Sequence, residues 1–367
     1  MWSPADFDYM QRALALAERG LYTATPNPRV GCVIVKDNQI IGEGWHQKAG
    51  ENHAETAALA DAKERGFNTD GATMYVSLEP CCHQGRVPPC TAAIIAANIK
   101  HVIAACSDPN PRAAHGGDIL RSAGIRFDLG LLEKEAQEIN RGFISRMRRK
   151  RPWVRCKIAA SFDGGTALQN GRSQWITNEA ARNDGHHYRA CACAVLTGIG
   201  TVRADNPSLT VRAVPTTRQP LRLVLDTLAQ ISPTSKLLSD GCADTMIITA
   251  KPRAASWSES VRYLHLPAHG MGGHYNANDL HTLMHTLGEM EINELHVEAG
   301  AALNGVLLEA DLIDEILYYC SPRILGNHSR RMFQLNQPLE TLDAFQRFSF
   351  LRTQVLGDDL RIELRRQ

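Results

Sequence analysis

The sequence predicts an α/β protein of two domains, and three observations lead to this prediction. The chain has 367 residues, which is too long for one ordinary core at about 150 residues per domain. Apolar runs of strand length alternate along it with amphipathic stretches of helix length. The pattern is broken by the basic run RMRRKR before Pro152. We therefore expect one domain over residues 1–147 and a second over residues 148–367.

Composition and charge narrow the classes of function. Hydrophobic residues make up 44% of the chain and charged residues 22%, which is typical of a globular protein. The net charge of +1 gives no global field for nucleic acid or an anionic membrane. No apolar run approaches the roughly 18 residues of a membrane span, and the N-terminus lacks a signal pattern. We expect a cytoplasmic protein with no membrane or nucleic-acid partner, and we interpret RMRRKR as a solvated linker, since no aromatic residues alternate with it.

The ten cysteines favour free thiols and metal ligands over disulfides, because the chain is long and carries no secretory signal. Six of them lie in apolar stretches and read as buried, inert thiols: Cys32, Cys106, Cys156, Cys191, Cys193 and Cys320. Cys81, Cys82 and Cys90 instead lie among Pro, Gly and His in a loop. These three are the candidates for metal chemistry.

The first half reads as a mixed sheet with flanking helices. Apolar residues at helical spacing predict a helix over residues 6–20. A turn at Pro26 precedes an expected hairpin of strands 30–35 and 40–46, and an alanine-rich helix follows over residues 53–65. The remaining expected elements are strand 74–78, helix 91–98, strands 102–105 and 125–127, and helix 132–147.

Two short pieces in this half carry the chemistry. His53 and Glu55 fall in the first turn of a predicted helix, Cys81 follows a predicted strand, and Cys90 opens the next helix. Zinc with three N or S ligands and an open fourth position holds a reactive water, and a nearby carboxylate that is not a ligand moves protons. The alternative is a closed zinc knuckle of Cys81 or Cys82, His83 and Cys90, which leaves Glu55 without a role.

The gap of eight residues between Cys81 and Cys90 departs from the usual Cys-x-x-Cys of zinc deaminases. The loop PCCHQGRVPPC, with PNPRVGCVIV, GEGWHQKAGENHAE, YVSLEPC and DPNP, resembles the deaminase half of the bifunctional riboflavin-biosynthesis deaminase-reductases, a cytidine-deaminase-like domain. The resemblance implies one zinc per chain on His53, Cys81 and Cys90, with Glu55 as the catalytic proton shuttle. It implies a substrate site of Asn27, His46, His83, Arg86, Asp108 and Asn110, although the sequence around Asn27 and His46 alone favours a turn-former or a surface imidazole.

The second half predicts α/β architecture with a largely parallel sheet. We expect strands at 153–159, 194–197, 221–226, 246–249, 295–298 and 316–319, with helical stretches between them and an antiparallel edge hairpin over residues 348–367. No GxGxxG occurs. Instead, Glu298 to Ala302 follow a strand and start a helix, where backbone N–H groups suit a cofactor pyrophosphate.

Five motifs in this half, KIAASFDGGTA, GRSQWIT, TVRADNPSLTVR, LVLDT and VEAGAALNG, resemble the reductase half of the same enzymes, which is built like dihydrofolate reductase. The resemblance implies NADPH contacts at Ala159, Trp175, Thr201, Asp205, Thr227, Gly300, Ala301, Ala302, Leu303, Asn304, Gly305 and Val306. It implies contacts with the sugar phosphate substrate at Lys157, Ser173, Arg189, Leu209, Arg212 and Glu298. Arg189 and Arg212 also suit phosphate chemically, because guanidinium forks match it, although surface salt bridges are the alternative.

Three positions depart from the family pattern. Cys82 stands where a serine is usual, His115 where a glycine is expected, and Gly165 where an arginine is expected. Cys82 adds a thiol beside a metal ligand, and His115 bears on the shape of its loop. Gly165 bears on a minor contact with the substrate or cofactor.

The family resemblance implies a substrate and a product for the two domains. The substrate is 2,5-diamino-6-ribosylamino-4(3H)-pyrimidinone 5′-phosphate, which the first domain deaminates, and reduction by the second gives 5-amino-6-ribitylamino-uracil 5′-phosphate. The alternatives are a nucleic-acid base deaminase with an accessory α/β domain and a non-catalytic zinc or nucleotide-binding regulatory module. The sequence leaves the oligomeric state open, a homo-oligomer included.

Overall fold

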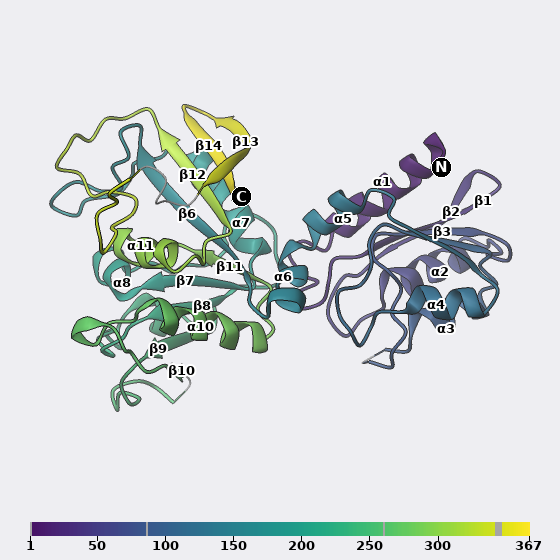
Figure 1. The fold of residues 1–367 in the computed structure, drawn as a ribbon, viewed down its shortest axis with the longest axis horizontal. Helices are drawn as coiled ribbons and strands as arrows, with labels where there is room; N and C mark the ends of the chain where they lie inside the picture. The colour runs from purple at the N-terminus through teal and green to yellow at the C-terminus, as the bar shows by residue number, and fades with distance from the viewer. Residues whose placement is uncertain (1, 86, 260, 342–346) are drawn as a thin grey trace. The chain divides into compact units, whose positions relative to one another are not determined.

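The computed structural model describes residues 2–85, 87–259, 261–341 and 347–367. The chain forms two compact units, residues 1–150 and 151–367 (Figure 1). The expected division between residues 147 and 148 falls inside helix α6 of the first unit. Within the described residues, no helix is long and apolar enough to cross a membrane.

The first unit is built on a mixed five-stranded sheet in the order β2-β1-β3-β4-β5. Strand β1 runs antiparallel to both β2 and β3, whereas β3, β4 and β5 are parallel. The bounds are β1 Gly31–Lys36, β2 Gln39–Trp45, β3 Thr73–Val76, β4 His101–Ala104 and β5 Arg126–Leu129. This agrees with the mixed sheet expected from the sequence.

Six helices accompany this sheet in the described residues: α1 Pro4–Glu18, α2 Ala54–Glu64, α3 Cys90–Ala96, α4 Gly116–Ser122, α5 Glu133–Ile139 and α6 Arg141–Arg149. The single helix expected over residues 132–147 is therefore wrong, since Asn140 separates two helices. The Asn140 side chain bonds both the N–H and the C=O of Arg29, each at 2.8 Å. The chain is turned there by a tertiary contact that has no local signal in the sequence.

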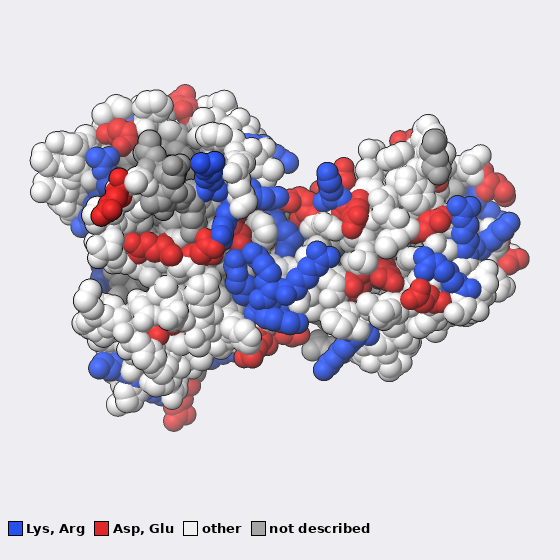
Figure 2. All heavy atoms as spheres, in the orientation of Figure 1, with Lys and Arg blue, Asp and Glu red and all other residues white. Residues whose placement is uncertain are grey.

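The basic run is also not a free linker. Helix α6 continues through Arg149, and its last turn carries Arg146, Arg148 and Arg149 (Figure 2 shows basic side chains gathered over this helix). The Arg149 guanidinium donates to Ser145 Oγ at 2.6 Å, and Arg146 donates to the carbonyl of Pro26 at 3.3 Å. The interpretation as a solvated linker was wrong for these residues, because basic residues suit the C-terminal end of a helix dipole.

Helix α2 lies unusually close to strand β2, and glycine makes this possible. A Cβ on Gly44 would stand 2.4 Å from the Ala58 nitrogen, and one on Gly42 would stand 2.4 Å from the Ala58 carbonyl oxygen. Ala54 and Ala58 are fully buried at this contact. Small residues on both elements therefore fix the start of α2, where His53 and Glu55 lie.

The second unit contains a nine-stranded sheet in the order β10-β9-β8-β7-β11-β6-β12-β14-β13. The pairs from β10 to β12 are parallel, and the hairpin β13–β14 adds antiparallel strands at one edge (Figure 1). The bounds are β6 Trp153–Ser161, β7 Ala194–Gly198, β8 Leu221–Leu225, β9 Thr245–Thr249, β10 Arg262–His265, β11 Glu294–Val297, β12 Glu315–Ser321, β13 Phe348–Leu356 and β14 Asp359–Arg366. The largely parallel sheet and the edge hairpin were both expected; the mostly exposed strand β10 was not.

The helices of this unit are α7 Glu179–Cys191, α8 Ile199–Asp205, α9 Lys236–Ser239, α10 Ala277–Glu289 and α11 Ala301–Glu309, with a short 3-10 turn at Met271–Gly273. Helices α10 and α11 cover one face of the sheet with an aliphatic core that includes Leu280, Leu283 and Leu307. The opposite face, under α7, carries buried charged residues such as Arg155 and Glu315. That polar layer leads to the second candidate site.

Candidate active sites

Three side chains expected to bind metal converge in the first unit. His53 is the N-cap residue of α2, Cys81 follows strand β3, and Cys90 is the first residue of α3. Their ligand atoms all lie within 4.8 Å of one another. His53 Nδ1 is 3.3 Å from Cys90 Sγ and 3.5 Å from Cys81 Sγ. Two helix starts and one strand end thus place an N/S/S donor set at one point.

The donor set fits zinc. Bond lengths of about 2.3 Å to sulfur and about 2.0–2.1 Å to nitrogen, at a tetrahedral angle, place N and S ligands about 3.6 Å apart. The two N–S distances here match that spacing. The pKa of Cys81 is lowered by hydrogen bonds from Cys90 and His53, which outweigh the effect of burial and favour the thiolate that binds metal. Three ligands leave a fourth position for water or substrate.

Glu55 lies beside this donor set in the first turn of α2 and is 3% exposed. Burial, together with the charge of Cys81, raises the pKa of its carboxyl group to about 7. A carboxyl group with a pKa near neutrality can both take and return a proton. Glu55 therefore has a position and a chemistry that a closed structural zinc knuckle would not need.

The extra thiol of Cys82 points to a different partner. Its Sγ donates to the carbonyl oxygen of Ala114 at 2.9 Å, and it is not among the three clustered ligand atoms. Burial and the charge of Cys81 raise the pKa of Cys82. In this structure the second cysteine therefore ties the Cys81 loop to the segment before α4 and does not compete for the ligand position.

Asn27 and His46 form one chain of contacts that ends at the ligand histidine. Asn27 Nδ2 is 3.0 Å from His46 Nε2, and His46 Nδ1 is 3.0 Å from the carbonyl oxygen of Asn52. Because a carbonyl can only accept, Nδ1 carries the proton and Nε2 accepts from Asn27. Burial lowers the pKa of His46, which agrees with a neutral ring, and this ring meets that of His53 edge-on at 5.3 Å. The interpretation of His46 as a surface imidazole was wrong.

Asp108 also lies close enough to His53, Cys81 and Glu55 to interact with their charges. It is 9% exposed, and burial raises its pKa to about 7 even though its Oδ1 accepts the N–H of Asn110 at 2.8 Å. Glu79, which we did not predict as a site residue, holds this loop: its carboxylate accepts the N–H groups of Asp108 at 3.3 Å and Gly117 at 3.0 Å. Its place directly before Pro80 and Cys81 was the available signal.

The other described residues that the resemblance implies for the first substrate site make fewer contacts with the donor set. His83 follows Cys82 in the loop, and its buried Nδ1 has no hydrogen-bond partner in the part of the chain that the structure describes. Asn110 Oδ1 accepts the N–H of Arg112 at 3.1 Å. Arg86 lies outside the described residues.

A second cluster of charges lies in the second unit, under helix α7. The guanidinium of Arg189 donates two hydrogen bonds to the Glu298 carboxylate, Nε to Oε1 at 2.7 Å and Nη2 to Oε2 at 3.0 Å. Lys157 Nζ from β6 is 4.0 Å from Glu298 Oε2. Burial alone would raise the pKa of Glu298, but the charges of Arg189 and Lys157 outweigh burial and lower it. The guanidinium of Arg189 is therefore occupied by a carboxylate, and this arginine is held in a partly buried ion pair.

His186, one turn before Arg189 on α7, is a residue that sequence reasoning missed. The N–H of Arg212 donates to His186 Nδ1 at 3.1 Å. Burial and the charges of Arg189 and Arg212 lower the pKa of His186 to about 4. The ring is thus neutral with its proton on Nε2, a fixed donor beside Lys157, Arg189 and Arg212. Its spacing of three residues from Arg189 was the available signal.

Most of the residues expected to bind NADPH fall into two groups. One group lies at the carboxyl edge of the parallel sheet, and the other makes packing contacts along helix α11. Ala159 lies on β6, Thr201 and Asp205 lie on α8 after β7, Thr227 follows β8, and Gly300 caps α11 after β11. These elements share the carboxyl edge of the parallel sheet, where open α/β sheets bind ligands. Open space surrounds Gly300, since a Cβ there would meet nothing within 4 Å. Ala301 and Ala302 form the first turn of α11.

The rest of α11 is used for packing. Leu303 and Val306 pack against the aliphatic core, and Asn304 Nδ2 donates to the carbonyl of Met332 at 3.3 Å. A Cβ on Gly305 would stand 1.8 Å from the carbonyl oxygen of Gln334, so this glycine permits contact with the neighbouring chain segment. Its close approach is to protein backbone.

Three further predicted positions lie on loops. Leu209 is buried with a φ of 51°, Ser173 is half-buried, and Trp175 is 61% exposed with the Arg182 guanidinium 4.6 Å from its ring. Gly165, where we expected arginine, leaves no room for a side chain, because a Cβ would stand 2.6 Å from Ser329 Oγ. The expected contact at this position is absent from this chain.

Comparisons with known proteins match a different family model to each half of the chain. The model of the cytidine and deoxycytidylate deaminase zinc-binding region matches residues 4–106, and that of the RibD C-terminal domain matches residues 152–362. The riboflavin biosynthesis protein RibD of Escherichia coli is 43% identical over 369 residues, which cover 97% of this chain and 98% of the relative. The RibD protein of Haemophilus influenzae is 42% identical, with 98% and 97% covered.

Solved structures extend the match to the fold of the whole chain. Acinetobacter baumannii RibD gives a TM-score of 0.89 at 41% identity over 99% of both chains. The diaminohydroxyphosphoribosylaminopyrimidine deaminase/5-amino-6-(5-phosphoribosylamino)uracil reductase of Thermotoga maritima gives 0.89 at 32% identity, also over 99% of both. With an N/S/S donor set in the deaminase region and a charged cluster in the reductase region, the chain belongs to the RibD family of bifunctional riboflavin-biosynthesis enzymes.

Proposed function

We propose that the first domain deaminates 2,5-diamino-6-ribosylamino-4(3H)-pyrimidinone 5′-phosphate and that the second reduces the ribosyl side chain with NADPH, giving 5-amino-6-ribitylamino-uracil 5′-phosphate. The observation that carries the proposal is the buried carboxyl group of Glu55 beside the convergent His53, Cys81 and Cys90. The two activities named for the Thermotoga maritima relative support the choice of substrate. The enzyme acts on a small molecule.

His53, Cys81 and Cys90 would hold one zinc ion per chain. When bound, zinc supplies a water that is acidic enough to react near neutral pH. Glu55, which is buried beside these ligands, would accept a proton at its carboxylate and return it to the departing amino group. Its carboxyl group is buried, so bulk water does not compete for that proton.

We propose that side chains near the Glu55 carboxyl group bind the substrate of the deaminase. Asn27 and His46 are held in one orientation by their mutual contact, which makes them suitable for the polar edge of a base. His83, with an unpaired buried nitrogen among the described residues, suits the ribose or phosphate. The further contacts that we propose are Arg86, Asp108 and Asn110.

For the reductase we propose that NADPH, which supplies a hydride when bound, lies along the carboxyl edge of the sheet. Its contacts would be Ala159, Trp175, Thr201, Asp205, Thr227 and Gly300, with the first turn of α11 beneath the pyrophosphate. Lys157, Ser173, Leu209, Arg212, Arg189 and Glu298 would hold the sugar phosphate. Because Arg189 is paired with Glu298, we assign the direct phosphate contact to Arg212 and give Arg189 a supporting charge.

Two coupled assays on the purified chain test this proposal. The pyrimidine nucleotide should release ammonia without NADPH, and NADPH should be oxidised only after that release. Ammonia release from an RNA or DNA oligonucleotide, with none from the nucleotide, would replace the proposal with a nucleic-acid deaminase. A chain that binds zinc but turns over neither substrate would be a regulatory module.

A further inference from the structure

We propose that Asp163 is a positioning residue of the reductase, which fixes the loop carrying Ser173 and Trp175 to the segment after strand β12. We call residues 162–178, between β6 and α7, the β6 loop, and residues 322–331 the β12 segment. The inference rests on the proposed function, because Ser173 and Trp175 are ligand contacts only there. Asp163 has no assigned role in that proposal.

The two segments start side by side. Strands β6 and β12 are parallel neighbours, and their register ends with Ser161 opposite Ser321. Beyond that point the N–H of Phe162 donates to the carbonyl of Arg323 at 2.9 Å. Further along, Thr166 N–H donates to the Arg330 carbonyl at 2.8 Å, and Arg330 N–H to the Ala167 carbonyl at 2.9 Å. The two segments are thus joined again, after the parallel pairing ends, by an isolated antiparallel bridge between Ala167 and Arg330.

The carboxylate of Asp163, at the start of the β6 loop, binds backbone N–H groups of the β12 segment. Its Oδ2 accepts the N–H of Gly326 at 2.7 Å, and its Oδ1 accepts the N–H of Leu325 at 3.1 Å and the hydroxyl of Ser161 at 2.6 Å. Gly326 has a φ of 80°, which is the conformation of a turn that suits glycine. These hydrogen bonds lower the pKa of Asp163 to about 2, so the acceptor stays ionised at neutral pH.

Close approach of the two segments also depends on Gly165. Its N–H donates to Ser161 Oγ at 2.9 Å, and a Cβ on it would stand 2.6 Å from Ser329 Oγ and 2.8 Å from Ser329 Cβ. A side chain at this position would therefore push the β12 segment away. The departure from the arginine expected here is explained by this contact.

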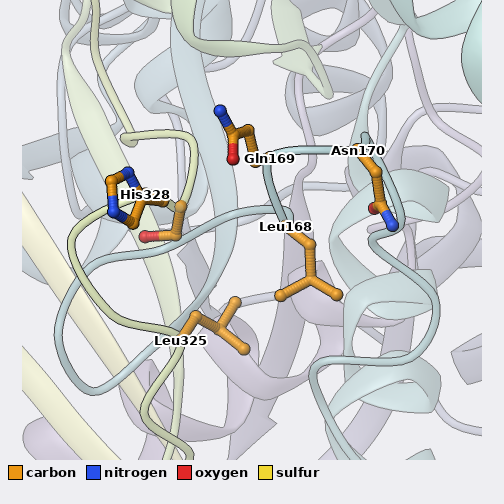
Figure 3. Close-up of a pocket in the computed structure, with 6 residues that line it drawn as sticks. Leu168, Gln169, Asn170, Leu325 and His328 are labelled. Carbon is orange, nitrogen blue, oxygen red and sulfur yellow. The ribbon is translucent and has the colours of Figure 1, made fainter.

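Side-chain packing does not replace these hydrogen bonds. A pocket of about 550 Å³ separates the two segments beyond the bridge, with Leu168 and Leu325 on opposite sides of it (Figure 3). Its lining residues are Leu168, Gln169, Asn170, Leu325, His328 and Ser329. The contacts that hold the β6 loop to the β12 segment therefore include the Asp163 carboxylate, the backbone bridge and the Thr166 hydroxyl, which donates to the carbonyls of Arg330 and Arg331 at 3.3 Å.

The far end of the β6 loop is held independently. Asn178 N–H donates to Asp359 Oδ2 at 2.6 Å, and Asn178 Nδ2 donates to the carbonyl of Leu356 at 2.7 Å. Ser173 and Trp175 lie between this anchor and the Asp163 anchor. Loss of the Asp163 contacts therefore weakens the attachment of the half of the loop that precedes them, while leaving the backbone bridge, α7 and the sheet in place.

The test is Asp163→Asn in the full chain, with Asp358→Asn, an exposed turn residue of the same domain, as the matched control. If release lowers the seated fraction of the loop to about one tenth, the Kd for NADPH rises about tenfold. Trypsin should then also cleave faster at the exposed Arg172 in the absence of ligand. Deamination and the unfolding temperature of the first domain should match the wild type.

A second pair of variants, at Gly165 and Ser329, tests the close approach of the same two segments without changing the charge. Gly165→Ala should raise the Kd for NADPH in the same direction, and Ser329→Gly added to it should restore binding. An unchanged Kd in Asp163→Asn, even with a lower unfolding temperature, would make Asp163 a merely structural residue and overturn the inference. Failure of the wild-type chain to bind NADPH would refute the proposed cofactor instead, and the trypsin result would still test the anchor.

Discussion

Replacing Glu298 with glutamine tests the charged cluster of the reductase domain. The change removes one negative charge from a site where Arg189 makes two hydrogen bonds and Lys157 lies 4.0 Å away. Glutamine keeps the shape of the side chain, but its amide accepts through one oxygen and presents an NH2 group to the other guanidinium N–H. Two positive charges are then left without their partner.

The structure sets the size of the effect. Removing one partner of a buried ion pair costs about 3–5 kcal/mol. Glu298 and Arg189 are 15% and 13% exposed, and glutamine keeps one acceptor, so we expect a loss of about 2–3 kcal/mol from the free energy of unfolding. Because the folded pKa of Glu298 is below the ordinary 4.5, this contribution is present above about pH 4.5 and is lost as the pH falls further. The difference between wild type and variant should therefore narrow in acid.

Scanning calorimetry of the full chain measures this, with the reductase transition identified by its shift on adding NADPH. A loss of about 2–3 kcal/mol should lower that transition by about 5–10 °C and leave the deaminase transition in place. Glu289→Gln, on the exposed face of α10, is the matched control and should change stability by no more than about 0.5 kcal/mol. A shift for Glu298→Gln no larger than that of the control would refute the buried pair.

Three further predictions concern single contacts. His115→Gly should stabilise the first domain by about 0.5–1 kcal/mol in thermal unfolding, because His115 has a φ of 76° and only glycine adopts this conformation without strain; a loss of stability would contradict this. Cys82→Ser should keep one zinc per chain by metal analysis whereas Cys81→Ser should lose it, and the reverse would exchange their roles. His186→Leu should weaken binding of the phosphorylated substrate of the reductase several-fold in KM and leave the Kd for NADPH unchanged, and a change in NADPH binding alone would move His186 to the cofactor site.

Much of the fold could be predicted because its elements have strong local patterns. Apolar runs such as Gly31–Lys36 and Ala194–Gly198 are buried strands where the pattern predicts them, and the edge hairpin turns at Gly357. The errors lie where a distant contact decides. Asn140 breaks a helix because of Arg29, more than one hundred residues away in sequence.

The convergence of His53, Cys81 and Cys90 could be predicted for the same reason, since His53 and Cys90 lie at helix starts and Cys81 lies in the loop after strand β3. The contacts between site residues could not. Nothing in the sequence says that Arg189 pairs with Glu298, that Cys82 bonds to Ala114, or that Gly165 makes room for Ser329. These contacts join segments that meet only when the sheet has formed, so composition and spacing carry no signal for them.

The most direct test of the two-site account is Glu55→Gln in the full chain. The variant should keep one zinc per chain and lose at least about a hundredfold in ammonia release, because it has lost the proton carrier beside the ligands. It should still reduce the deaminated pyrimidine nucleotide with NADPH at the wild-type rate. Ammonia release near the wild-type rate, or loss of both activities in a chain that remains folded and zinc-loaded, would contradict the account.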